Sequence, residues 1–107
     1  MVAAMSTLSG PVATLAEVSR LAADSVGPWL NEYEGYRGTL VLTDEERQLA
    51  RLVTFWDTAA DEARARESRG AMRDQLAATA GMEVVDFGVF EVIGHQFLAD
   101  LEVERPD

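Results

Sequence analysis

The sequence lacks cysteine and lysine, and it has a single histidine and a single asparagine. The absence of cysteine excludes disulfides, thiolate metal sites, iron–sulfur clusters and cysteine nucleophiles. The sequence also has no phosphate-binding loop and no metal-ligand spacing, so we expect neither a metal nor another cofactor. No stretch approaches the roughly 18 apolar residues of a membrane span, and residues 1–8 lack the basic start of a signal peptide. We therefore expect a cytoplasmic protein without a membrane partner.

Negative charge dominates the composition. The net charge is −10, and all nine basic residues are arginines. This balance disfavours binding to nucleic acid, whose backbone is itself anionic. The 107 residues suffice for one domain with one core, and a chain of this size gains stability by burying surface in a dimer.

Hydropathy patterns predict alternating strands and helices along the chain. A short strand precedes Gly10, and Thr14 with Glu17 forms a capping box that predicts the start of the first helix. Thr58 with Asp61 predicts the second helix start. That helix is expected to end at Gly81, with its apolar side formed by Ala59, Ala63, Met72, Leu76 and Ala80. Residues 82–93 alternate as a long strand, and residues 96–103 could add a short terminal strand.

The best patterned stretch is a hairpin over residues 36–56 with charged residues 44–47 at its tip. With Thr43 opposite Gln48, alternation separates two faces. The face expected to pack on the helices holds Tyr36, Leu40, Leu42, Leu49, Arg51, Val53 and Phe55. The opposite face holds Arg37, Thr39, Val41, Ala50, Leu52, Thr54 and Trp56. The second face is too apolar to stay in water, so something should cover it.

The element order β-α-β-β-α-β is typical of the α+β ferredoxin-like fold. We expect one domain over residues 1–107, with a core of about 1–94 and a C-terminal extension over 95–107. Both helices should cover one face of the antiparallel sheet. Two such sheets packed face to face would close a dimeric α/β barrel, which predicts a homodimer.

Three short motifs within this order resemble a known family. Residues 34–38 read Glu-Gly-Tyr-Arg-Gly, an apolar run follows over 40–42, and residues 56–58 read Trp-Asp-Thr before a helix. Together they resemble the antibiotic biosynthesis monooxygenase-like dimeric α/β barrels, over nearly the whole chain. Members of that family include cofactor-free oxygenases of polycyclic aromatics, haem-degrading enzymes and many proteins of unknown activity.

The chain also departs from the family pattern. Many members place a histidine on the second helix about nine residues after the tryptophan, where this chain has Ala65. The haem-degrading members resemble one another in an asparagine on the first strand, whereas the asparagine here is Asn31, in the predicted first helix. The resemblance therefore disfavours haem degradation.

Five aromatic residues are predicted to gather where the first helix meets the hairpin. These are Trp29, Tyr33, Tyr36, Phe55 and Trp56. Such a group can hold a flat apolar ligand by stacking, or it can be ordinary core. The alanine-rich second helix could leave space for a ligand above the sheet.

Arg51 and His95 are the candidate catalytic residues. Arg51 stands alone among apolar residues, so it could stabilise an anion such as an enolate or phenolate, or else form an ion pair or extend to the surface. His95 is the natural proton acceptor if acid–base chemistry occurs, but it follows Gly94 at a strand end, which is also typical of a surface or interface residue. A third feature, the arginine group Arg66, Arg69 and Arg73, could receive an anionic group or form a solvated helix face.

Two hypotheses of function follow. In the first, a small homodimeric α/β barrel binds an apolar aromatic molecule, and it could be a cofactor-independent monooxygenase with His95 as base and Arg51 stabilising the anion. In the second, the protein is a non-catalytic binding or assembly module whose aromatic group is core. A pocket lined by these aromatic residues would favour the first hypothesis.

Overall fold

The computed structural model describes residues 1–15, 17, 20, 30–69 and 72–96. Its strands are β1 (Val2–Ser9), β2 (Tyr36–Asp44), β3 (Leu49–Trp56) and β4 (Glu83–Glu91), and its helices are α3 (Ala59–Arg69) and α4 (Met72–Thr79). Residues 12–15, 17, 20 and 30 are also helical. Each predicted strand up to residue 93 is confirmed to within two residues, but the strand predicted over 96–103 lies, except for Gln96, outside the described residues.

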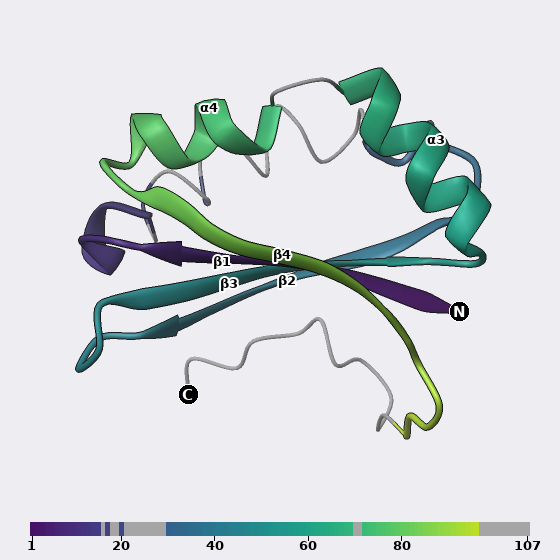
Figure 1. Ribbon diagram of the computed structural model, residues 1–107, viewed down its shortest axis with the longest axis horizontal. Helices are drawn as coiled ribbons and strands as arrows, with labels where there is room; N and C mark the ends of the chain where they lie inside the picture. The colour runs from purple at the N-terminus through teal and green to yellow at the C-terminus, as the bar shows by residue number, and fades with distance from the viewer. Residues whose placement is uncertain (16, 18–19, 21–29, 70–71, 97–107) are drawn as a thin grey trace.

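The four strands form one antiparallel sheet in the order β2-β3-β1-β4. Both α3 and α4 lie on the same side of this sheet (Figure 1). A sheet in which the first strand lies between the third and the last, with helices on one face, is the α+β ferredoxin-like arrangement. The predicted fold class is thus confirmed.

The β2–β3 hairpin has a different register from the predicted one. Asp44 pairs with Leu49, so the loop spans residues 45–48, and Gln48 adopts a positive φ of 55° while its N–H donates to the carbonyl of Glu45. The pairing is therefore displaced by two residues from Thr43 opposite Gln48. Because side chains alternate with a period of two, this displacement leaves nearly every residue on its predicted face.

The face that packs on the helices, however, was predicted wrongly. Ala50 packs with Ala77 of α4 and with Ala80, which follows that helix, and Trp56 packs against Ala65 of α3. We call this the helix side of the sheet. Alanines on the helices allow close approach, so the bulk in this layer comes from Trp56 and from Leu8, Val12, Leu15 and Met82 rather than from the leucines of the hairpin.

The opposite side, here called the open face, carries the residues that we expected to lie under the helices. It comprises Ala3, Met5, Thr7, Leu40, Leu42, Leu49, Arg51, Val53, Phe55, Asp86 and Phe90. Several of its large apolar side chains are exposed, among them Leu40, Leu42 and Phe90.

Two bulges move residues between the faces. Tyr36 pairs with Trp56 but Gly38 pairs with Phe55, so Arg37 is an extra residue in β2. Tyr36 thereby joins the helix side with Trp56, which corrects its predicted place beside Leu40. A second irregularity in β4 leaves Val85 half-exposed between the residues that pair with β1.

The start of α3 is as predicted, since the backbone N–H of Asp61 donates to Thr58 Oγ1 at 3.0 Å. Its buried side differs from the prediction, because Ala59 and Ala63 are exposed whereas Glu62 and Ala65 are buried. The first helical residues begin at Val12, after Pro11, so Thr14 is not a cap. Among the described residues, no helix has the length and hydrophobicity needed to cross a membrane.

Gly35 fixes the path from residues 30–34 into β2, and we expect Gly35→Ala to destabilise the fold. Gly35 has a φ of +84°, and a Cβ added there would lie 2.3 Å from Asp61 Oδ2. Backbone strain and displacement of Asp61 should together lower the free energy of unfolding by about 1–3 kcal/mol, measured by urea denaturation. Gly94→Ala is the control, since its Cβ would enter open space. Equal stability of the two variants would contradict this account of Gly35.

Candidate functional site

Trp56 is the centre of the aromatic group on the helix side. It ends β3, has no solvent-exposed surface, and packs with Val2 of β1 and Ala65 of α3. Its indole Nε1–H donates to Thr54 Oγ1 at 2.9 Å. The only polar group of the buried side chain therefore has a hydrogen-bond partner. The position of Trp56 is therefore determined by packing and by a hydrogen bond within its own strand.

Two tyrosines cover Trp56 edge-on. The ring centroid of Tyr36 lies 5.3 Å and that of Tyr33 6.5 Å from the indole, with interplanar angles of 65° and 75°. Both tyrosines are partly buried, and their hydroxyls are engaged, Tyr33 donating to Ser68 Oγ at 3.4 Å and Tyr36 sharing a hydrogen bond with Thr39. Three of the five predicted aromatic residues thus meet in one cluster, which we call the Trp56 cluster.

The other two predicted members are not part of this cluster as described. Phe55 precedes Trp56 in β3, so its side chain lies on the open face, where it neighbours Ala3 and Gly38. Its predicted place in the aromatic group was wrong, because the face that carries Phe55 points away from the helices. Trp29 lies outside the described residues.

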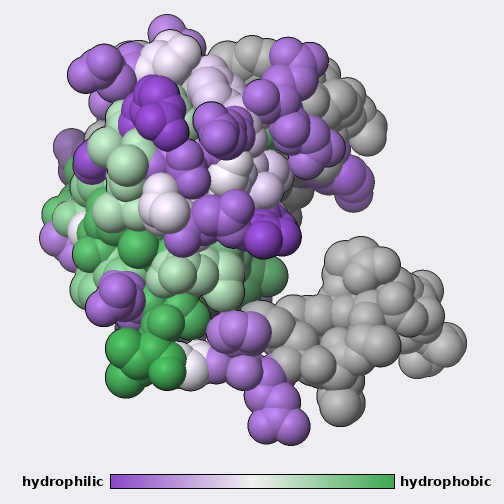
Figure 2. All heavy atoms as spheres, turned by 90° about the vertical axis from the view of Figure 1, so that its right-hand side faces the viewer, coloured by the Kyte–Doolittle hydropathy of each residue, from purple (hydrophilic) through white to green (hydrophobic). Residues whose placement is uncertain are grey.

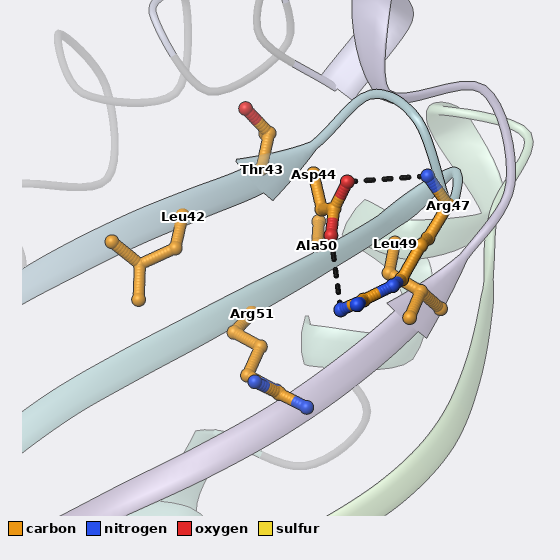
Figure 3. Close-up of a pocket in the computed structure, with 7 residues that line it drawn as sticks. All are labelled: Leu42, Thr43, Asp44, Arg47, Leu49, Ala50 and Arg51. Carbon is orange, nitrogen blue, oxygen red and sulfur yellow. Dashed lines mark hydrogen bonds and ion pairs between the residues drawn. The ribbon is translucent and has the colours of Figure 1, made fainter.

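Arg51 also lies on the open face rather than beneath the helices, which corrects its predicted location. It is exposed, and its Nε–H donates to Thr7 Oγ1 of β1 at 3.4 Å. Figure 3 shows its side chain extending from β3 toward the neighbouring strand, at the edge of a hollow near the hairpin tip. Arg51 was a candidate because a charge buried among apolar residues needs an anionic partner. Since its side chain is exposed, it needs no such partner here. Its catalytic role stays a prediction.

The hollow beside Arg51 has a volume of about 100 Å³. Its walls include Leu42 and Leu49, and Arg47 in its rim is paired with Asp44 at 3.4 Å (Figure 3). Pockets that bind small organic molecules are usually about 300–1,000 Å³. The hollow is therefore too small for a polycyclic ligand in this single chain.

His95 lies beyond the end of β4 and is exposed. Figure 1 shows the chain after β4 turning toward the side of the sheet opposite the helices. The segment that carries His95 therefore leaves the helix side, where the Trp56 cluster lies. The structure does not bring His95 together with that cluster, and its role as a base stays a prediction.

The i, i+4 spacing of Glu62 and Arg66 predicts their ion pair, which is confirmed, but the sequence analysis missed that Glu62 is buried. Its side chain is 1% exposed, and among the described residues it is the only charged side chain that is buried. Glu62 Oε1 lies 3.3 Å from Arg66 one turn on, whereas Oε2 has no hydrogen-bond partner among the described residues. An acidic residue in the first turn of a helix usually faces water, so the sequence around Glu62 gives no local signal of its burial.

The three arginines predicted to form a basic cluster are only partly described. Arg66 lies over the ring of Phe87 in β4, with Cζ 4.9 Å from the centroid, while it pairs with Glu62. This places its guanidinium at the border between α3 and the sheet. The side chains of Arg69 and Arg73 lie outside the description.

Asp61 and Arg64 form the other ion pair of α3, at 2.6 Å. The hydrogen bond from Arg64, helped by the one from Thr58, lowers the pKa of Asp61 below its ordinary value, and the same contact raises the pKa of Arg64. Both groups stay charged near neutral pH, so this pair supports the helix start rather than acid–base chemistry. The described residues contain no group of three or more histidine, aspartate or glutamate side chains that could hold a metal.

We expect Trp56→Ala to cost about 3–5 kcal/mol of unfolding free energy, because it removes a fully buried indole and leaves a cavity. Phe90→Ala is the matched control, since Phe90 is 53% exposed and its loss should cost well below 1 kcal/mol in the monomer. Urea denaturation at low protein concentration measures both. Similar costs for the two variants would show that Trp56 does not anchor the core.

No protein-family model matches this sequence, and no curated protein is similar to it. Solved structures are similar to the fold. A candidate antibiotic biosynthesis monooxygenase from Deinococcus radiodurans superposes with a TM-score of 0.64 at 15% identity, covering 92% of this chain and 98% of that one. The cofactor-independent oxygenase SnoaB from Streptomyces nogalater superposes with a TM-score of 0.60 at 14% identity, covering 92% of this chain and 97% of that one.

A third similar structure is the heme-degrader MhuD from Mycobacterium tuberculosis, solved with two hemes bound in its active site. Its TM-score is 0.63 at 17% identity, and the match covers 91% of this chain and all of that one. At such low identities the similarity concerns the fold and carries no activity across. The chain has the ferredoxin-like α+β fold of the antibiotic biosynthesis monooxygenase-like proteins.

Proposed function

We propose that this protein is a homodimer that binds a flat, apolar aromatic molecule between α3 and the sheet, against Trp56. The observation that carries the proposal is the Trp56 cluster, in which an indole at the end of a strand is covered by two tyrosines that are only partly buried. Aromatic side chains of this kind bind flat ligands through offset or edge-to-face contacts.

Ligand binding requires the tyrosines to move. Trp56 has no accessible surface, and among the described residues Tyr33 and Tyr36 are the rings against it, so in this proposal one of them changes rotamer to admit the ligand. The hydroxyl contacts of the two tyrosines, with Ser68 and Thr39, lie near the surface and exchange for water at little cost. Ring contacts of about 0.5–1.5 kcal/mol each would be replaced by equivalent contacts with the ligand.

The open face supports the homodimer. It exposes Leu40, Leu42 and Phe90, and the central residues Ala3 and Val53 carry no charge. Figure 2 shows hydrophilic side chains gathered toward the helices at the top of the view and hydrophobic ones below them. An apolar sheet face of this kind is unfavourable in water, and a second copy of the same face would bury it.

Cofactor-independent oxygenation is the catalytic form of this proposal. The similarity in fold to SnoaB, a cofactor-independent oxygenase, favours it. Heme chemistry of the kind named for MhuD fits less well, because α3 contains no histidine and Ala65 packs directly against Trp56. Arg51 lies on the open face and His95 does not lie at the Trp56 cluster, so their roles as anion-stabilising group and base stay a separate prediction. Oxygen consumption by His95→Ala and Arg51→Ala with an added substrate would test that prediction.

The competing function is a non-catalytic assembly module whose aromatic cluster is core. The complete burial of Trp56 is the observation that favours it. The two functions predict different results when an aromatic probe is added. A binding site takes up the probe and saturates, whereas a packed core does not bind it.

We expect the protein to sediment as a dimer at micromolar concentration, and we expect Leu40→Glu to shift it toward monomer. Leu40 is 37% exposed on the open face and pairs with Val53, whereas Leu42 faces Arg51, so a charge at position 40 would be buried in the dimer without a cross-strand partner. Val41→Glu is the matched control, because Val41 is 39% exposed but lies on the other side of β2. Analytical ultracentrifugation that finds the unaltered protein monomeric would disprove the dimer.

We expect 2-naphthol to bind the protein and Trp56→Leu or Tyr33→Ala to weaken binding by about tenfold or more, because each loses a stacking surface. Tyr33→Ala serves as the second variant because a partly buried tyrosine can be removed without unfolding the core. Phe90→Leu, on the open face, should bind as the unaltered protein does. Isothermal titration calorimetry measures the affinities, and equal affinities in all four proteins would place the ligand elsewhere.

A further inference from the structure

The residue that the proposed function leaves unexplained is Glu62. Glu62 and Ala65 are three residues apart in α3, so they lie on the same helix face, and Ala65 contacts Trp56. Both side chains are buried. The carboxylate of Glu62 therefore lies in the layer between α3 and the sheet that contains the Trp56 cluster.

This carboxylate is only half satisfied. Arg66 contacts Oε1 at 3.3 Å, and Oε2 has no partner among the described residues. A buried acceptor without a partner costs about 1–3 kcal/mol, and more when it is charged. The N-terminal turn of α3 offsets part of the cost, because helix dipoles favour negative charge there.

Arg66 does not simply neutralise Glu62. Its side chain is 45% exposed and lies over the Phe87 ring, so its charge is shared between water, the ring and Oε1. Arg66 holds Oε1 in place, and no described residue donates to Oε2. The geometry is that of an oriented hydrogen-bond acceptor rather than of a closed bidentate ion pair.

We propose that Glu62 Oε2 accepts a hydrogen bond from the ligand, so that the site selects aromatic molecules carrying a hydroxyl or N–H donor over those without one. This inference rests on the proposed function, since it needs an aromatic ligand at the Trp56 cluster. Glu62 is a specificity-determining residue in this account, and Arg66 positions it. An anionic group on the ligand at this point would be rejected by the carboxylate.

The test compares 2-naphthol with its methyl ether, 2-methoxynaphthalene, by isothermal titration calorimetry. A hydrogen bond to a charged acceptor corresponds to a preference of about ten- to hundredfold for the naphthol in the unaltered protein. Glu62→Gln should reduce this preference to about threefold or less, and Glu62→Leu should abolish it. Glu67→Gln, which changes an exposed glutamate of the same helix, should keep the full preference.

Thermal unfolding separates this role from a structural one. If Glu62 serves binding at the expense of stability, Glu62→Leu should have a Tm equal to or higher than that of the unaltered protein. A lower Tm for Glu62→Gln and Glu62→Leu, with an unchanged ligand preference, would make Glu62 a structural residue and overturn the proposal.

The two proposals fail in different ways. If both naphthalenes bind the unaltered protein equally well, the aromatic site stands and the assignment of Glu62 is overturned. If neither probe binds while the protein is folded and dimeric, the ligand site itself is overturned, and the role of Glu62 with it.

Discussion

The burial of Trp56 between the end of β3 and α3 is the contact on which the rest of this half of the molecule depends. The indole fixes α3 through Ala65, it contacts β1 through Val2, and it gives Tyr33 and Tyr36 a surface to pack on. The small size of Ala65 is part of the same constraint, because a larger side chain there would hold the helix away from the sheet. Under α4 the layer between helix and sheet is packed differently. The space beside Ala77 is filled there by larger side chains, namely Leu8, Val12, Leu15 and Met82.

The bulge at Arg37 determines which side chains reach this cluster. Strict alternation along β2 would place Tyr36 with Leu40 on the open face. The extra residue reverses its side and brings it opposite Trp56, while Gly35 and Asp57 connect the strand ends through a 2.8 Å backbone hydrogen bond. The same region is closed by the Arg37–Asp57 ion pair at 2.5 Å. The turn sequence therefore affects the site through backbone geometry rather than through catalytic side chains.

Sequence patterns predicted the strands, the hairpin, the cap at Thr58 and the fold class, because period-two alternation and turn chemistry are local properties of the chain. They did not predict which face of the sheet meets the helices. Both faces of the hairpin are apolar, and the decision depends on how the volumes of Trp56, Ala65 and Ala77 fit across a layer, which is not a local property. Arg51 and Phe55 were misplaced for this one reason. Tyr36 was misplaced for another reason, because strict alternation was assumed across Gly38, although a glycine inside a strand is the usual sequence signal of a bulge.

Glu62 could not have been singled out by composition either, because the chain has 19 acidic residues and only nine basic ones. In such a chain most carboxylates have no arginine available, and water solvates them at the surface at no cost. A surplus of acidic residues therefore explains exposed glutamates such as Glu67, but it does not explain one in the helix–sheet layer. Leucine at that position would suit the neighbouring Ala65 and Trp56 better on packing grounds alone. A charged residue at a position where an apolar one would pack better is explained more readily by binding than by folding. Glu62 is such a residue.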